Sequence, residues 1–166
     1  MTSGFIAAAA ALSVAVPVPG NRCLSDSEGQ ALVMIVLPDV VAAIRSRCLP
    51  SLPATATLSQ AGQVIAARWQ SDAALVRDEA DRAIDKIGPV ALTSMIGRTA
   101  ARNMVSTTIR QEVTRRLAIA DCPTADIVID ALSPLPARNI ARAVLAIESG
   151  GKTPSTLPFS LCRTKA

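Results

Sequence analysis

The sequence predicts an all-α protein: a compact orthogonal or antiparallel bundle of five to six helices, held by two disulfides and followed by an extended C-terminal tail. Of its 166 residues, 50% are hydrophobic but only 2% are aromatic, so the core must be built from small aliphatic side chains. Such side chains suit packed helices better than sheets, in which β-branched and aromatic residues pack best. Apolar residues also recur every three or four positions, which is the helical period.

The N-terminal segment has the pattern of a secretory signal peptide. Residues 5–15 are apolar, and Ser13 and Ala15 supply the small residues expected before a cleavage site, although the first four residues lack Lys and Arg. We therefore expect residues 1–15 to be a signal peptide, 16–22 to be a linker, and the protein to be periplasmic or secreted. The alternative is a buried N-terminal helix. A transmembrane span is not expected, because it needs about 20 apolar residues.

The first helical region begins with a capping box. Ser25 can accept a hydrogen bond from the Glu28 amide, while the Glu28 carboxylate accepts one from the Ser25 amide. Pro38 interrupts the apolar pattern that follows, and a proline inside a helix costs about 3 kcal/mol. The sequence therefore predicts a break near Leu37 and a second helix from Pro38 to about Arg47.

The clearest helix is predicted over residues 65–87. Its apolar face consists of Ile65, Trp69, Ala73, Val76, Ala80, Ile84 and Ile87, which are spaced by three or four positions. Trp69 is therefore expected in the core. The acids of this helix are interpreted as a solvent-exposed face, because a hard cation needs about six to eight oxygens, usually from a loop. These acids are Asp72, Asp78, Glu79, Asp81 and Asp85.

Three further helical segments are predicted. A long region over residues 90–120 changes its apolar face along its length, which indicates either a bend near Gly97 or a helix that is buried on more than one side. A segment at 126–132 has a helical pattern but would also suit a strand, and a last helix is expected over 137–148, closed by a pair of glycines. In the first half of the long region the apolar stripe is Leu92, Ile96, Ala100 and Met104.

Two disulfides are predicted from the four cysteines, Cys23, Cys48, Cys122 and Cys162. A metal site is not expected, because the chain has no histidine and no C-x-x-C pair. Of the three possible pairings, we prefer Cys23–Cys48 with Cys122–Cys162, since each would close a local hairpin or tail. Cys23–Cys162 with Cys48–Cys122 would instead tie both chain ends to the middle. The helical domain would span residues 23–151, with the 152–166 tail held by Cys162.

One segment has a candidate catalytic residue. The absence of histidine excludes a Ser-His-Asp triad, a Cys-His pair and histidine-bound metals, and no cofactor is expected. The segment Ala146-Ile-Glu-Ser-Gly-Gly151 resembles the catalytic-acid segment of lytic transglycosylases. That resemblance implies that Glu148 protonates a glycosidic oxygen. Because only 18 residues follow Glu148, we prefer to interpret it as a last-turn residue before a glycine C-cap.

A second candidate is a group of five arginines around a single acid, Glu112. On a helix, Arg98, Arg102 and Arg116 fall near one another around the axis, and such a set is able to bind phosphate, a lipid head group or an acidic protein. The alternative is a solvated face, with some arginines paired to acids on the 65–87 helix. Nucleic acid is not an expected partner, because the region has no interleaved aromatic residues.

These patterns predict an exported, non-catalytic binding or accessory protein of the cell envelope, with a formal net charge of +4. Its expected partner is an envelope protein or an anionic surface. Two other functions stay open: a cell-wall glycan-cleaving enzyme that uses Glu148, and a protein that binds anionic membrane surfaces through the Arg98–Arg116 patch.

Overall fold

The chain is helical, which confirms the predicted all-α class. The computed structural model describes residues 23–88, 92–150 and 159–162, so the expected signal peptide and linker lie outside the described residues. Within these residues the chain forms eight α-helices: α1 (Asp26–Cys48), α2 (Thr57–Gln60), α3 (Gly62–Ala74), α4 (Arg77–Ile87), α5 (Leu92–Ile96), α6 (Arg98–Arg116), α7 (Cys122–Leu132) and α8 (Ala137–Gly150).

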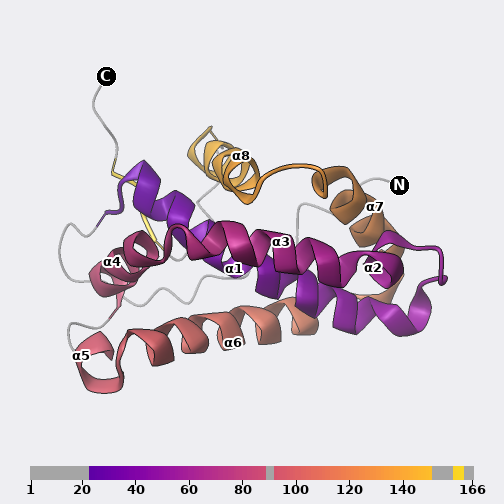
Figure 1. Ribbon diagram of the computed structural model, residues 1–166, viewed down its shortest axis with the longest axis horizontal. Coiled ribbons are helices and arrows are strands. Elements are labelled where there is room, and N and C mark those ends of the chain that lie inside the picture. The colour runs from indigo at the N-terminus through magenta and orange to yellow at the C-terminus, as the bar shows by residue number, and fades with distance from the viewer. Residues whose placement is uncertain (1–22, 89–91, 151–158, 163–166) are drawn as a thin grey trace.

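Helix α1 is the centre of the fold (Figure 1). Helices α3, α4, α6 and α8 all pack against it, and α6 and α8 lie on opposite sides of it. Its 23 residues correspond to a length of roughly 34 Å. Residues 31–34 are buried in succession, because neighbouring helices surround this part of α1 instead of covering one face.

Pro38 does not break α1, so the predicted end near Leu37 is wrong. The helix continues from Asp26 to Cys48 with Pro38 buried inside it. A proline in a helix interior costs about 3 kcal/mol, because it removes a hydrogen bond and clashes with the preceding turn. The helices that pack around α1 offset this cost, and such tertiary packing supplies most of the stability of helices in proteins.

Two of the predicted helices are divided. The predicted 65–87 helix forms α3 and α4, which separate at Leu75 and Val76, where Val76 has φ −117° and ψ 15°. The predicted 90–120 region bends at Gly97, as expected. Gly97 has a φ of 79°, a left-handed conformation that glycine adopts without steric cost. These divisions and the short α2 explain why the described residues contain eight helices instead of five to six.

The core is aliphatic around a single tryptophan. Trp69 is 1% exposed and belongs to a cluster with Val41 and Ile65, which confirms its predicted core position. Its indole Nε1 donates a hydrogen bond to the Leu135 carbonyl oxygen at 3.2 Å, so the polar atom of the ring has a partner. A second cluster contains Leu24, Ala80, Ile84 and Ala101.

The cysteines pair across the molecule. The disulfides are Cys23–Cys162 and Cys48–Cys122, so the preferred pairing of Cys23 with Cys48, and of Cys122 with Cys162, is wrong. The continuity of α1 is the reason. It places Cys23 just before the first turn and Cys48 at the last residue, much farther apart than the roughly 7 Å between Cα atoms that a disulfide can bridge. Cys48–Cys122 joins the end of α1 to the start of α7 and is fully buried.

Residues 159–162 form a C-terminal strap across the start of α1. The Leu24 amide donates a hydrogen bond to the Ser160 carbonyl at 2.9 Å, and the Cys162 amide donates one to the Leu24 carbonyl at 2.8 Å. The Leu161 side chain lies over Gly29, where an added Cβ atom would stand 2.8 Å from Leu161 Cδ2. The strap therefore packs closely on α1, and Cys162 attaches it covalently to Cys23.

Candidate functional site

The three arginines of the predicted binding set share α6 but do not form one patch. Arg98 and Arg102 are one turn apart at the start of the helix, and Arg116 is its last residue. Arg116 therefore lies roughly 27 Å along the axis from Arg98. Each also has different surroundings: Arg98 is exposed, whereas Arg102 and Arg116 are half-buried. The helical period aligns them on one side of α6, but the length of the helix separates them.

Arg102 is engaged with an acid of α4. Its Nη1 atom lies 2.7 Å from both carboxylate oxygens of Asp81, and the Asp81 side chain is only 8% exposed. The interpretation of Asp81 as part of a solvated face is therefore wrong. This pair agrees with one part of the alternative, in which an arginine of this segment binds an acid of the predicted 65–87 helix. This ion pair joins α6 to α4, so Arg102 has a role in holding the two helices together.

Glu112 accepts hydrogen bonds from two arginines at the other end of α6. Arg115 Nη2 lies 2.7 Å from Glu112 Oε1, and Arg116 Nε contacts the same oxygen. The Arg115 guanidinium, and after it that of Arg116, holds the pKa of the Glu112 carboxyl below its ordinary value. Arg115 is 69% exposed, whereas Arg116 is 17% exposed. Arg115 is therefore accessible to an external anion, whereas Arg116 is largely enclosed and contacts Glu112.

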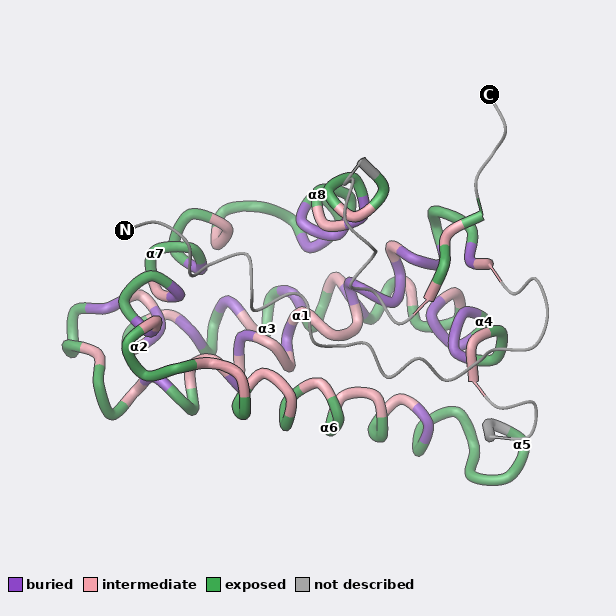
Figure 2. The backbone as a smooth tube through the Cα atoms, turned by 180° about the vertical axis from the view of Figure 1, so that it is seen from behind, coloured by how far each residue is buried: buried purple, intermediate pink, exposed green. Residues whose placement is uncertain are grey.

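The side of α6 that faces away from α1 is polar and exposed. Figure 2 shows the helix as exposed and half-buried residues for most of its length, and Ala101 is its one buried residue. Arg98 and Arg110 are exposed on it. The remaining exposed residues of α6 include no acid, and they are Thr99, Ala100, Asn103, Met104, Thr107, Thr108, Gln111, Thr114 and Arg115. No exposed carboxylate on α6 therefore opposes the charge of these arginines.

An exposed apolar group at the α5 end of α6 was missed by sequence reasoning. Met95 is 79% exposed, Ile96 is 43% exposed, and Met104 on α6 is 56% exposed. Ile96 and Met104 were expected to share a packed stripe, and that expectation is wrong. Gly97 turns the chain between α5 and α6, so the two residues do not continue one helical face. The buried Ala101 shows that another side of α6 meets the core. Two adjacent large apolar residues before a glycine were the signal.

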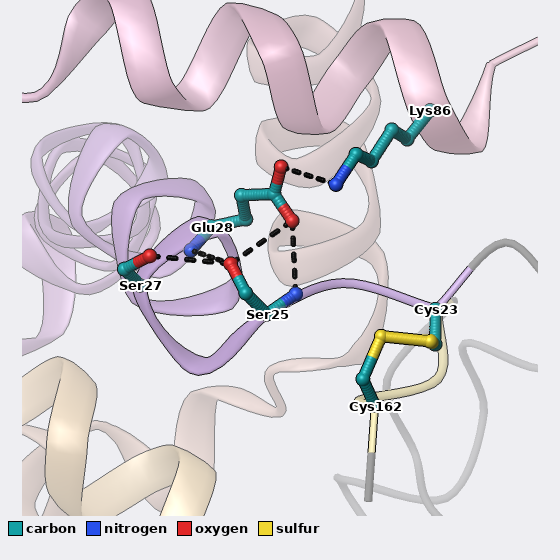
Figure 3. A network of polar contacts seen from close by, with 6 residues as sticks. All are labelled: Cys23, Ser25, Ser27, Glu28, Lys86 and Cys162. Carbon is teal, nitrogen blue, oxygen red and sulfur yellow. Dashed lines mark hydrogen bonds and ion pairs between the residues drawn. A yellow bond between two sulfur atoms is a disulfide. The ribbon is translucent and has the colours of Figure 1, made fainter. Parts of the chain in front are cut away.

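The start of α1 and the end of α4 are joined by a polar network beside the Cys23–Cys162 disulfide (Figure 3). The predicted capping box is confirmed: the Ser25 amide donates to Glu28 Oε2 at 2.8 Å, and the Glu28 amide donates to Ser25 Oγ at 3.3 Å. Lys86 Nζ lies 2.6 Å from Glu28 Oε1. The hydrogen bond from Lys86, assisted by those from Ser25, lowers the pKa of Glu28 below its ordinary value of 4.5, although burial opposes the shift.

This network makes an acid-dependent contribution to stability. Because the pKa of Glu28 is lower in the folded chain, its carboxylate stabilises the fold above about pH 4.5, and this contribution disappears as the pH falls through the folded pKa. We expect Glu28→Gln to lower the free energy of unfolding by up to about 1 kcal/mol at neutral pH, because glutamine keeps the capping box but loses the charge that pairs with Lys86. The difference should be smaller near pH 3 than at neutral pH, because the pKa of Glu28 is lowered in the folded chain. Urea unfolding followed by far-UV circular dichroism at both pH values measures this difference.

Lys86→Gln is the matched control, because it removes the ion pair and leaves the capping box in place. Since Lys86 is the largest cause of the pKa shift, this variant should flatten most of the same pH dependence. Its cost at neutral pH should be smaller, because the Lys86 side chain is 48% exposed and solvent screens its charge. A constant difference between wild type and Glu28→Gln from pH 7 to pH 3 would contradict this account.

Two other acids bind the ends of helices. The Asp72 carboxylate accepts a hydrogen bond from the Ala137 amide at 2.9 Å, at the first residue of α8. The Asp126 carboxylate accepts hydrogen bonds from the amides of Thr57 and Leu58 at 3.2 Å and 2.6 Å. Carboxylates at helix N-termini satisfy amides that lack a partner within the helix. Asp72 therefore has a structural role, and Asp78 and Asp85 are the acids of the predicted cluster that are exposed.

Glu148 lies in the last turn of α8 and is half-buried. The predicted helix is confirmed, and it continues to Gly150, whereas Gly151 lies outside the described residues. The position agrees with the interpretation of Glu148 as a last-turn residue, and the glycine C-cap stays a prediction. Its proposed role as a general acid stays a prediction from the transglycosylase-like segment.

Within residues 23–88, 92–150 and 159–162, no cluster of three or more acids and cysteines is arranged to hold a metal ion. In that part of the chain, no helix combines the length and the apolar character needed to cross a bilayer. Comparison with known proteins finds no matching family model, no matching curated protein and no matching solved structure.

Proposed function

We propose that this chain is an exported, non-catalytic binding protein of the cell envelope that binds an anionic partner through α6. The distribution of charge carries this proposal. Helix α6 contains five arginines and one glutamate, whereas the other residues carry 12 basic and 12 acidic groups. The net charge of +4 is therefore located on one helix, and such local excess attracts anions.

Exposure shows which arginines are suited to this role. Arg98 and Arg110 are exposed, and Arg115 is 69% exposed although it also contacts Glu112. Arg102 and Arg116, by contrast, are held by contacts with Asp81 and Glu112. The proposed binding residues are therefore Arg98, Arg110 and Arg115, and of the set predicted from the sequence only Arg98 keeps the primary role.

Export is supported by two independent features. Residues 1–15 have the pattern of a signal peptide, and all four cysteines form disulfides, which form and persist in oxidising compartments. The envelope is such a compartment, and anionic polymers and lipids are common there. The reducing systems of the cytosol would break these two disulfides, whereas an oxidising compartment preserves them.

Binding to soluble poly-glutamate tests the location of the site. We expect the wild type to bind at low salt and to weaken as salt rises, because exposed charges are screened. Arg98→Gln combined with Arg110→Gln should reduce the affinity about tenfold, whereas Arg138→Gln with Arg142→Gln on α8 should change it less than about threefold. All four arginines are exposed, so the two pairs differ in location and not in charge. Equal losses for both pairs would contradict a site on α6.

A second result would contradict the non-catalytic part of the proposal. If the wild type cleaved peptidoglycan and Glu148→Gln did not, the chain would be an enzyme of the type that the Glu148 segment resembles. We expect neither protein to release soluble fragments.

A further inference from the structure

The end of the molecule formed by α5 is exposed and apolar. Figure 1 shows α5 at one extremity of the fold, beyond the start of α6, and α6 is its main neighbour. Met95 and Ile96 close α5, with 79% and 43% of their surfaces exposed. We call Met95, Ile96 and Arg98 the α5 tip.

The tip combines two kinds of group that act together at membrane surfaces. Met95 and Ile96 are apolar side chains that gain free energy on leaving water. Arg98 follows them directly and is exposed, and it begins the helix that holds the net positive charge of the chain. Apolar side chains that enter the boundary of the acyl chains, beside cations that meet anionic head groups, are the two contributions to interfacial binding.

We propose that the α5 tip docks on an anionic lipid surface, with Met95 and Ile96 entering the interface and Arg98 meeting the head groups. This inference rests on the proposed function and names its ligand. Of the proposed binding residues Arg98, Arg110 and Arg115, this inference assigns the lipid contact to Arg98, at the end of α6 next to the α5 tip. Arg102 contributes less directly, because Asp81 holds it.

The shape of the tip favours a lipid surface over an acidic protein. A stable protein interface buries about 800 Å² on each partner, and a single helical turn at the extremity of a fold offers little of that area. A bilayer, by contrast, accepts any apolar side chain that reaches it. The five residues of α5 expose two large apolar side chains, Met95 and Ile96, to such a surface.

Vesicle co-sedimentation of the exported chain, with residues 1–15 removed and both disulfides formed, tests this proposal. The probes are vesicles of phosphatidylcholine alone and of phosphatidylcholine with phosphatidylglycerol. The wild type should bind the anionic vesicles, with an affinity that falls as salt rises. Met95→Ser combined with Ile96→Ser should weaken this binding at least about tenfold. Residues 1–15 are absent from every variant, so differences between variants report the tip.

Ile127→Ser is the matched control for the apolar part. Ile127 is 67% exposed and lies on α7, at the opposite end of the molecule from α5 (Figures 1 and 2), so its replacement should change vesicle binding less than about twofold. Arg138→Gln is the corresponding control for Arg98→Gln. Circular dichroism must show the same helical content in all variants, and a tip variant that has lost it is replaced by Met95→Ser alone.

The outcomes separate this inference from the proposed function. Binding to poly-glutamate through α6 without binding to anionic vesicles at low salt would overturn the lipid proposal and leave the proposed function in place. Binding to neither would overturn both. Equal losses for Ile127→Ser and the tip variant would overturn the assignment to the tip, since apolar exposure in general would then explain the binding.

Discussion

Replacing Cys48 and Cys122 with alanine should lower the free energy of unfolding by about 3 to 5 kcal/mol. The bridge joins positions 74 residues apart, for which the loss of chain entropy in the unfolded state corresponds to about 4.5 kcal/mol. Both cysteines are fully buried in the Trp69 cluster, so lost packing adds to this effect. Urea unfolding of the double variant and the wild type, followed by circular dichroism, measures the difference.

The second disulfide, Cys23–Cys162, differs from Cys48–Cys122 in its exposure to solvent. Cys23–Cys162 encloses the Cys48–Cys122 loop, but Cys162 is exposed and attaches only the C-terminal strap. A mild reductant should therefore open Cys23–Cys162 first, because access controls thiol exchange. Alkylation followed by peptide mapping should label Cys23 and Cys162 before the other two. Earlier labelling of Cys48 and Cys122 would contradict the burial on which the prediction rests.

The parts of the fold that the sequence predicted correctly are those set by neighbouring residues. The capping box of Ser25 and Glu28 depends on a spacing of three residues. The bend at Gly97 depends on the conformational freedom of one glycine. The core position of Trp69 follows from the helical period. Each of these signals acts within one or two turns of the chain.

The errors come from contacts between distant segments. Pro38 remains inside α1 because four other helices pack around α1. The stabilisation from this packing cannot be read from a local sequence pattern. The wrong cysteine pairing followed from the wrong break, since only a turn at Leu37 could bring Cys23 to Cys48. The burial of Asp81 likewise depends on Arg102, which is 21 residues away in sequence.

The candidate site was also only partly predictable. The excess of arginine in α6 is a property of the sequence, and the helical period correctly aligned Arg98 with Arg102. Which arginines are available depends on partners in α4 and within α6 itself. The exposure of Met95 and Ile96 depends on α5 leaving the path of α6 at Gly97. The exposure of a side chain to a ligand depends on the tertiary structure. Composition alone therefore could not show which of these residues are accessible.

Trp69→Ala should have an effect as large as the loss of the buried disulfide. Trp69 is 1% exposed at the contact between α3 and α1, and truncating a buried tryptophan costs about 3 to 5 kcal/mol, because apolar contacts are lost and a cavity remains. Trp69→Phe keeps most of the ring volume but removes the hydrogen bond from Nε1 to the Leu135 carbonyl. It should cost about 1 to 2 kcal/mol. Circular dichroism is the suitable probe, because these variants lack tryptophan fluorescence.

Leu75→Ala is the control for these two variants, because Leu75 follows α3 and is 82% exposed. An exposed substitution of this kind should stay within about 0.5 kcal/mol of the wild type. If Leu75→Ala lowered the free energy of unfolding as much as Trp69→Ala, burial of the side chain would not be the cause of the Trp69 effect. If Trp69→Phe were as damaging as Trp69→Ala, the hydrogen bond to Leu135 would dominate over packing. The expected order places apolar burial first, because a chain with only 2% aromatic residues depends on the burial of its one tryptophan.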